Sequence, residues 1–323
     1  MVQNFLDQFW PSTVDGLSLG AIYALVALGY TMVYGVLRLI NFAHSEIFMI
    51  GTFAVVGAVE ALGINSPVGT LALIGLIVVL AVVAAVAAGG SAVLLELVAY
   101  RPLRRSGGSR LAALISAIGA SLFLQQLFAI VVIPRFFDRP LAGGHLPVQS
   151  NDFTDPVNLF SIGSVDFRSD KVIIFVGALL MMVALDQFVS RTRLGRGIRA
   201  TAQDPETAVL MGVNIDRIVM ATFALGGAMA GVAAALYMMR FEETVYTVGF
   251  LLGIKAFTAA VLGGIGNLRG ALIGGMALGL LEMYGSSIFG AEWRDVVAFS
   301  VLVLVLMFRP TGILGESLQR ARA

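Results

Sequence analysis

Long apolar runs with few charges constrain this chain more than any other feature. A helix needs about 20 such residues to cross a bilayer core, where every backbone polar group must be satisfied within the protein. Eight runs are predicted to be spans, roughly Gly16 to Val36, Ile47 to Leu62, Pro67 to Val98, Leu111 to Ile133, Val172 to Val189, Ile218 to Met238, Ala271 to Ile288 and Val296 to Phe308. A ninth, Phe250 to Gly264, is shorter and contains Lys255, so it either spans or re-enters. The sequence therefore predicts an all-α, polytopic transmembrane bundle of about 8 to 9 spans with broken or re-entrant helices, forming one domain over residues 1–323.

Composition excludes several classes of protein. Only 13% of the residues are charged, against roughly 25% in soluble domains. The net charge of +1 leaves no basic face for nucleic acid. The absence of cysteine excludes disulfides, thiolate metal sites and a cysteine nucleophile. With two histidines, His44 and His145, the constellation that an enzyme needs is missing, and we expect no catalytic residues, metal site or cofactor.

Basic residues in short connections predict the orientation. Arginines gather in two loops, one with Arg101, Arg104, Arg105 and Arg110, the other with Arg191, Arg193, Arg196, Arg199 and Arg217. Both loops should face the cytoplasm. The segment 134–171 mixes charges of both signs with Pro and Gly, and is predicted to be an external loop. Counting crossings from these loops places the N-terminus outside and the C-terminus in the cytoplasm.

Small residues four apart predict close helix packing, because they let backbones approach where lipid supplies no hydrophobic drive. Four spans carry the spacing: Ala81, Ala85, Gly89; Ala112, Ser116, Ala120; Gly227, Gly231, Ala235; and Ala271, Gly275, Gly279.

Two groups of polar residues and glycines interrupt the apolar runs. Glycines permit helix breaks, and broken helices expose backbone groups to a substrate at mid-membrane depth. A third polar feature is a stripe on the fourth span, formed by serines and glutamines. Together these features predict a translocation pathway bounded by Asn41, His44, Ser45, Glu46, Ser116, Gln125, Gly264 and Asn267.

Each of these features has a second interpretation. The group near His44 also fits a turn at the membrane surface, with His44 and Glu46 solvated or paired with each other. Hydrogen bonds between helices explain the polar stripe equally well. A histidine beside a glutamate fits the proton relay of a secondary carrier, which would need further buried ionisable groups. The other candidate, Lys255, is interpreted as a snorkelling side chain near the outer end of its segment.

The cytoplasmic loop 191–217 contains the signals of a short helix. Asp204 can cap it, Pro205 suits its first position, Glu206 suits its first turn and Gly212 can end it. Such a helix is either a solvated connector or a docking element for a soluble partner. In the second case its apolar contacts would be Ala208, Val209 and Met211.

Four stretches resemble the LivH-type permease subunits of branched-chain amino-acid ABC importers. They are RLINFAHSEIFMIG (Arg38 to Gly51), RLAALISAIGASLFLQ (Arg110 to Gln125), GIKAFTAAVLGGIGNLRGALIGG (Gly253 to Gly275) and RPTGILG (Arg309 to Gly315), and the resemblance extends over essentially the whole chain. It implies a permease of the cell inner membrane that translocates leucine, isoleucine and valine. The spacing of Glu206, Ala208 and Gly212 is similar to that of the EAA-type coupling motif, which docks in a cleft of the ATPase. Thr207 stands where a second alanine is usual. The residues expected to couple to the ATPase are therefore Asp204, Glu206, Ala208, Met211 and Gly212.

The resemblance also implies partners. These are two ATPase subunits, a second permease subunit, and a periplasmic or surface-tethered binding protein. For the permease pair the resemblance favours a heterodimer with a LivM-type subunit over two copies of this chain. The chain has no G-x-x-x-x-G-K-[ST] phosphate loop, so ATP hydrolysis must belong to a partner. Urea, short-chain amides or other amino acids are alternative substrates within the same architecture. A stand-alone carrier or channel is the remaining alternative.

Overall fold

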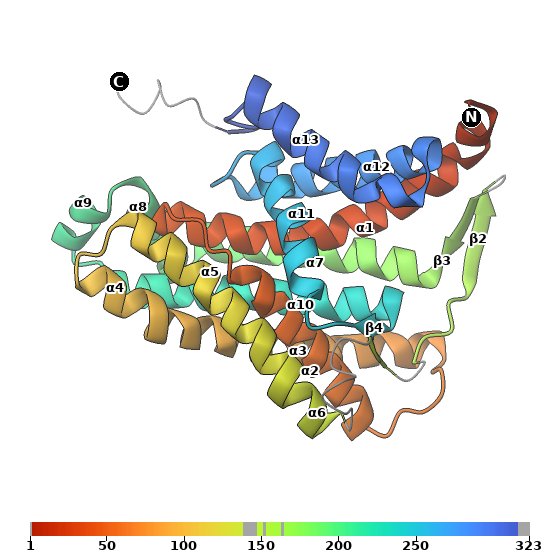
Figure 1. Ribbon diagram of the computed structural model, residues 1–323, viewed down its shortest axis with the longest axis horizontal. Helices are drawn as coiled ribbons and strands as arrows, with labels where there is room; N and C mark the ends of the chain where they lie inside the picture. Colours follow the sequence, from red (N-terminus) through yellow and green to blue (C-terminus); the bar gives the residue numbers. More distant parts are fainter. Residues whose placement is uncertain (1, 138–146, 151–152, 163–164, 316–323) are drawn as a thin grey trace.

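The computed structural model describes residues 2–137, 147–150, 153–162 and 165–315 (Figure 1). Helices dominate this part of the chain. In order they are α1 (Val2–Leu37), α2 (His44–Ala61), α3 (Thr70–Leu95), α4 (Arg101–Arg105), α5 (Arg110–Leu127), α6 (Ile133–Phe136), α7 (Ser169–Arg191), α8 (Arg193–Gln203), α9 (Pro205–Leu210), α10 (Ile215–Phe241), α11 (Val248–Gly263), α12 (Leu268–Phe289) and α13 (Arg294–Phe308). Two π-helical segments, η1 (Glu96–Tyr100) and η2 (Phe128–Val132), continue α3 and α5, and a 3₁₀ turn, η4 (Ala291–Trp293), precedes α13.

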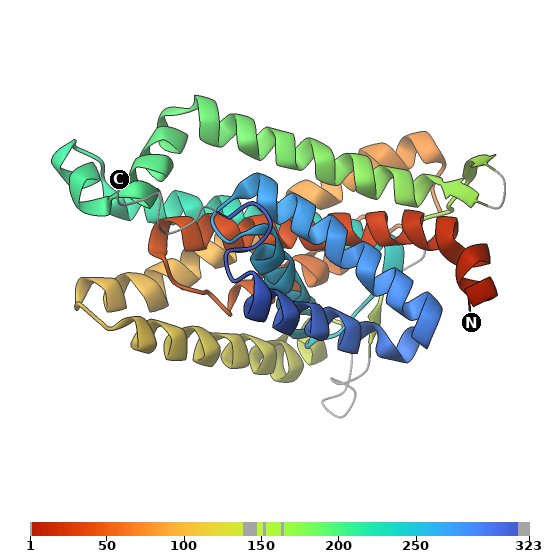
Figure 2. The same ribbon diagram turned by 90° about the horizontal axis from the view of Figure 1, so that it is seen from above.

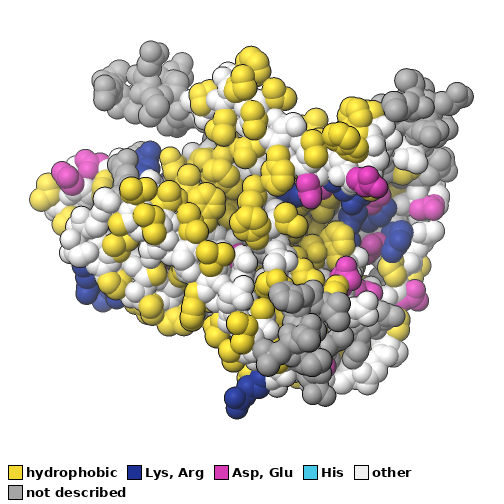
Figure 3. All heavy atoms as spheres, viewed as in Figure 1, with side chains coloured by type: hydrophobic (Ala, Val, Ile, Leu, Met, Phe, Trp, Pro, Cys, Tyr) yellow, Lys and Arg dark blue, Asp and Glu magenta, His cyan; other side chains and the backbone are white. Residues whose placement is uncertain are grey.

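Seven helical segments within the described residues are long and apolar enough to cross a membrane, which confirms the polytopic helical bundle. They are Gln8–Leu37, His44–Ala61, Ala72–Arg105, Leu111–Phe136, Ser169–Arg191, Ile215–Phe241 and Leu268–Phe289. The other two predicted spans correspond to shorter helices, α11 with 16 residues and α13 with 15. Apolar side chains cover much of the surface in Figure 3, and the charged ones lie mostly toward the two ends of the long axis.

The helix α11 is oriented differently from its neighbours. The helices α1, α3, α7 and α10 run along the long axis, whereas α11 crosses α1 steeply in Figure 1 and is seen nearly end-on in Figure 2. It contacts α1, α2, α12 and α13, so it joins the first helices of the chain to the last. The ninth predicted segment is therefore a transverse helix inside the bundle.

Glycines and alanines bring the central helices into backbone contact. A Cβ on Gly275 of α12 would lie 2.5 Å from Cα of Ala24 in α1, and one on Gly227 of α10 would lie 2.8 Å from the Ala88 carbonyl oxygen of α3. The predicted triplets are buried in α10 and α12, whereas in α3 only Gly89 of the triplet is fully buried, beside Ala84 and Ala88. In α5 the buried positions are instead Ala113 and Ala117, which share a face with Ser121 and Gln125, so polar contacts on that face set the rotation of the helix.

The predicted external loop 134–171 contains ordered elements that the sequence did not indicate. The helix α6 continues to Phe136, β1 (Val148–Gln149) pairs antiparallel with β4 (Glu243–Thr244), and β2 (Asn158–Ile162) forms a hairpin with β3 (Val165–Arg168). His145 and the basic tail after Gly315 lie outside the described residues.

Candidate functional site

The first predicted break lies deep in the bundle. The helix α1 ends at Leu37, Arg38 adopts a positive φ of 54°, and α2 begins at His44. The His44 ring fills the space where a Cβ of Gly29 would stand, eight residues before the end of α1. Eight helical residues correspond to about 12 Å. The connection therefore turns back alongside α1, and α2 starts well inside the molecule.

Glu46 joins three helices at this break. Its Oε1 accepts hydrogen bonds from the hydroxyls of Ser45 (3.2 Å) and Ser121 (3.0 Å) and from Nε2 of Gln125 (2.9 Å). Its Oε2 has no hydrogen-bond partner among the described residues and packs against Gly249, in the first turn of α11. A carboxylate is stabilised near a helix N-terminus, where the backbone dipoles leave partial positive charge. Glu46 therefore links α2, α5 and α11.

The interpretation of this region as a solvated surface turn is wrong. His44 and Glu46 are almost completely buried, and they face different neighbours. His44 packs edge-on against Tyr30 of α1, with ring centroids 4.8 Å apart. Ser116 is partly buried and lies earlier in α5, and the serine of the polar stripe that reaches Glu46 is Ser121.

The second predicted break connects α11 to α12. Gly264 has a φ of 105°, which favours glycine, and packs against the backbone of Gly315. Asn267 caps α12: its Oδ1 accepts from the amides of Arg269 (3.0 Å) and Gly270 (3.1 Å). Its Nδ2 donates to the Leu314 carbonyl at 3.0 Å. Both residues thus hold the C-terminal segment in place, a role that their sequence did not indicate.

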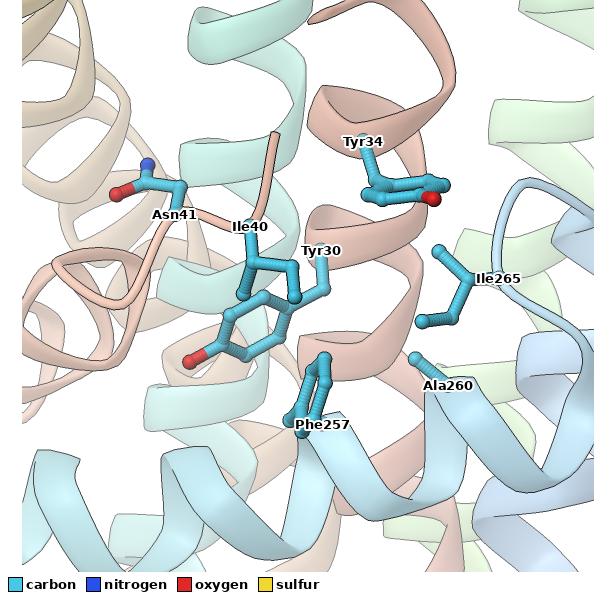
Figure 4. Close-up of a pocket in the computed structure, with 7 residues that line it drawn as sticks. All are labelled: Tyr30, Tyr34, Ile40, Asn41, Phe257, Ala260 and Ile265. Atoms are coloured by element: carbon cyan, nitrogen blue, oxygen red, sulfur yellow. The ribbon is translucent and has the colours of Figure 1, made fainter. Parts of the chain in front are cut away.

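A hollow lies where the two breaks meet. Its lining comes from α1, α11 and both connections, and consists of Tyr30, Tyr34, Ile40, Asn41, Phe257, Ala260 and Ile265 (Figure 4). Asn41 directs its amide away from the hollow, and its Oδ1 accepts a hydrogen bond of 2.7 Å from the Tyr100 hydroxyl in η1. The free space admits about one water molecule. The bundle is therefore closed to an organic solute at this point.

Lys255 does not snorkel. Its side chain is 12% exposed, and its Nζ lies 2.9 Å from Oε1 of Glu282 in α12 and 2.7 Å from Oδ1 of Asp295 in α13. Tyr23 of α1 donates to the other oxygen of Glu282 at 2.8 Å. The prediction of a snorkelling lysine was wrong because it did not take Glu282 into account. A carboxylate inside an apolar run indicates that a partner of opposite charge lies within the membrane.

The short helix predicted in the loop 191–217 is present as α9. The Asp204 carboxylate accepts from the amides of Glu206 (3.0 Å) and Thr207 (3.2 Å), and Gly212 has a φ of 83° just after the helix. Hydrogen bonds from the hydroxyl and amide of Thr207 lower the pKa of the Asp204 carboxyl, so the cap is charged at neutral pH. The loop also contains α8, a helix that the sequence did not indicate.

The apolar surface of α9 contains two of the three expected residues, Val209 and Met211, together with Leu210, which was not expected. Ala208 is 3% exposed and packs against its own chain, whereas Leu210 and Met211 are 85% and 80% exposed. Glu206 is also exposed. The exposure of Leu210 could not be predicted from the sequence. The outward face of this short helix is set by the burial of Ala208, and that burial depends on packing against α8 and α10.

A hydrogen bond connects this loop to the first break. The Arg38 guanidinium donates at 2.7 Å to the carbonyl of Ala202, in the last turn of α8. A cation suits this position, because carbonyls at a helix C-terminus lack helical partners. Arg38 therefore ties the start of the break to the residues that lead into α9.

Removing one of the side chains that donate a hydrogen bond to Glu46 should destabilise the fold. We expect Gln125→Ala to lower the free energy of unfolding by about 1–3 kcal/mol, because a buried carboxylate loses a hydrogen bond that nothing replaces. Thermal unfolding of the purified chain in detergent measures the change. Gln126→Ala is the matched control, since Gln126 is exposed on the same helix and its loss should change stability by less than about 0.5 kcal/mol. Equal effects of the two variants would contradict the role given to Gln125.

Comparison with known proteins places the chain in a family. A family model described as the permease component of the branched-chain amino acid transport system matches residues 12–306. The chain is 44% identical over 317 residues to the high-affinity branched-chain amino acid transport system permease protein BraD of Pseudomonas aeruginosa, covering 98% of this chain and 97% of BraD. It is 42% identical over 325 residues to the corresponding LivH protein of Escherichia coli K12, covering 98% of both chains.

A more distant relative comes from an archaeon. The probable branched-chain amino acid transport permease protein LivH of Methanocaldococcus jannaschii is 27% identical over 306 residues, covering 91% of this chain and 89% of the relative. No solved structure matches the chain. The match over nearly its full length shows that the chain belongs to the permease family of branched-chain amino acid transport systems.

Proposed function

We propose that this chain is the membrane-spanning permease subunit of an ATP-driven importer in the cell inner membrane, and that it translocates leucine, isoleucine and valine. The observation that carries the proposal is α9, a capped helix that presents Leu210 and Met211 to solvent in a chain without a phosphate-binding loop. Exposed apolar side chains on a polar connection are typical of a site that a partner covers. The names of the relatives supply the substrate class.

The partners are inferred from two functions that this chain does not supply by itself, ATP hydrolysis and a complete pathway for the substrate. Two ATPase subunits supply the energy, and a binding protein delivers the substrate. A second permease subunit of LivM type completes the pathway, because the helices α5 and α13 expose apolar faces and the hollow inside this chain alone admits no amino acid. In this assembly Asp204, Glu206 and Gly212 shape the docking helix, and Leu210 and Met211 enter the ATPase cleft.

Movement reaches the pathway through Arg38. A shift of α9 and α8 after ATP binding displaces the Ala202 carbonyl, and the bond to Arg38 carries that shift to the connection that leads to Asn41 and His44. Separation of the two breaks then widens the hollow between α1 and α11. Glu46 holds α2, α5 and α11 together during this motion, because its hydrogen bonds lie within the bundle.

Transport by the complete assembly tests the proposal. We expect proteoliposomes that contain the chain with its co-expressed partners to take up labelled leucine only when ATP and the binding protein are both supplied. Uptake of urea or a short amide in place of leucine would keep the mechanism and change the substrate. Flux through this chain alone would show that it is a carrier or a channel and would refute the importer.

The orientation is tested by labelling. We propose that the N-terminus lies outside and that the loop 191–217 and the C-terminus lie in the cytoplasm, as the arginine-rich loops favour. The chain has no native cysteine, so Gln203→Cys and Val157→Cys each give a single site on an exposed residue. An impermeant thiol reagent should label Val157→Cys in intact cells and Gln203→Cys only after the membrane is opened. The reverse pattern would invert the topology.

The docking role of α9 predicts a defect in coupling. We expect Leu210→Asp to reduce ATP-dependent uptake at least about tenfold, since a buried charge at the centre of an interface is rarely tolerated. The amount of protein in the membrane should not change, because Leu210 contacts solvent in the isolated chain. The control is Leu194→Asp, on an exposed leucine of the neighbouring helix α8, which should keep uptake near the wild-type rate. Normal uptake by Leu210→Asp would remove the coupling assignment.

A further inference from the structure

The span that contains α5 exposes a polar side chain far from either membrane surface. Gln126 is exposed, whereas its neighbour Gln125 points inward and donates to Glu46. The span covers Leu111–Phe136, and Gln126 lies about 14 Å along the helix from Arg135 at one end and about 24 Å from Arg110 at the other. Hydrocarbon offers no hydrogen-bond partner to an amide, so a glutamine at this depth faces protein or water.

Gln126 belongs to a stripe along α5. Ser116, Gly119, Phe123 and Gln126 are spaced by three and four residues, so they lie one above another on the same side of the helix. This side points away from the buried face that contains Ser121. A Cβ on Gly119 would meet no atom of the described chain within 4 Å, so another helix can approach closely there. We call these four residues the α5 stripe.

The outer surfaces of α3 and α7 have a different composition. Between residues 72 and 98, and again between residues 176 and 184, every exposed residue is Ala, Gly, Val, Leu or Ile. Surfaces of this kind suit lipid chains, which are as apolar as leucine. In Figure 2, α7 lies along one edge of the molecule, and α5 and α13 lie along the opposite edge. The helix α13 also exposes a polar residue, Ser300, in the middle of its length.

We propose that the α5 stripe is the contact with the second permease subunit of the importer, and that a helix of that subunit places a polar side chain opposite Gln126. The proposal rests on the function proposed above and assigns one of its subunit contacts to named residues. The ATPases and the binding protein are soluble, so the second permease subunit is the partner with side chains at the depth of Gln126. Gly119 lets the partner helix come close, and the Gln126 amide fixes the register of the two helices.

A pair of glycine variants in the co-expressed assembly tests the contact. Gly119→Leu should reduce the second permease subunit that copurifies with this chain at least about fivefold, because a close helix contact cannot accommodate the added volume. Gly90→Leu is the matched control, since a Cβ on Gly90 likewise has open space and the residue lies on the aliphatic surface of α3. Thermal unfolding of the isolated chain should show that both variants fold. Equal copurification by the two variants would overturn the proposal.

A second pair of variants tests the amide. Gln126→Leu should weaken the same copurification about threefold, which is the effect of losing one hydrogen bond between membrane helices. Gln187→Leu should leave it unchanged, because Gln187 is an exposed glutamine near the end of α7. An unchanged yield of the second subunit with Gln126→Leu would show that the amide faces water instead of the partner.

Photo-cross-linking identifies what covers the stripe. With p-benzoylphenylalanine in place of Phe123, irradiation should join this chain to the second permease subunit, whereas the same replacement of Val82 in α3 or Leu180 in α7 should give no protein product. A product that contains two copies of this chain, or the absence of any protein product at Phe123, would overturn the proposal. ATP-dependent leucine uptake by the same preparations separates the two proposals. Normal uptake and copurification with Gly119→Leu would refute the contact alone, whereas uptake by the wild-type chain without partners would refute the importer.

Discussion

The carboxylate of Glu46 is the interaction on which the interior of the bundle depends. It stands where the chain turns back into the membrane region, and it accepts hydrogen bonds from α2 and α5 on one oxygen while the other faces the start of α11. A break in a membrane helix is tolerated only where protein satisfies the freed polar groups. At this break, side chains from two helices satisfy Oε1 of Glu46. The re-entrant connection, the transverse position of α11 and the rotation of α5 all follow from this arrangement.

Contacts of two other charged side chains, Lys255 and Arg38, also join separate helices of the molecule. The Lys255 ion pairs attach the transverse helix to the α12–α13 hairpin, so α11 is held at both of its faces. The Arg38 bond attaches the first break to the cytoplasmic loop. The polar groups of this protein are thus placed at joints between helices, and the motion proposed for transport occurs where these joints meet around the hollow.

The sequence was sufficient for features governed by local physics. Length and hydropathy predicted the spans, and the Asp204, Pro205 and Gly212 signals predicted α9, because capping depends on a few neighbouring residues. Features that depend on distant partners were not predictable in this way. Lys255 needed Glu282, the orientation of α9 needed the burial of Ala208, and the hydrogen bond from Asn267 to the Leu314 carbonyl needed the C-terminal segment. The polar residues near Glu46 were identified, but their depth and their donor Ser121 emerged only from the packing of α5.

The contact between α1 and α12 has a consequence for how this protein is made. Their backbones touch through Gly20 and Gly275, yet the two helices are separated by more than 200 residues of chain. The first helix must therefore wait in the membrane until almost the whole chain has been synthesised, and contacts of such long range form slowly. Until α5 and α11 have been made, His44 and Glu46 lack some of the helices that cover them in the finished bundle, because both helices follow them in the chain. A chain that lacks α12 also leaves Lys255 and Tyr23 without Glu282, so polar groups that are buried in the finished bundle stay unpaired until that helix is made.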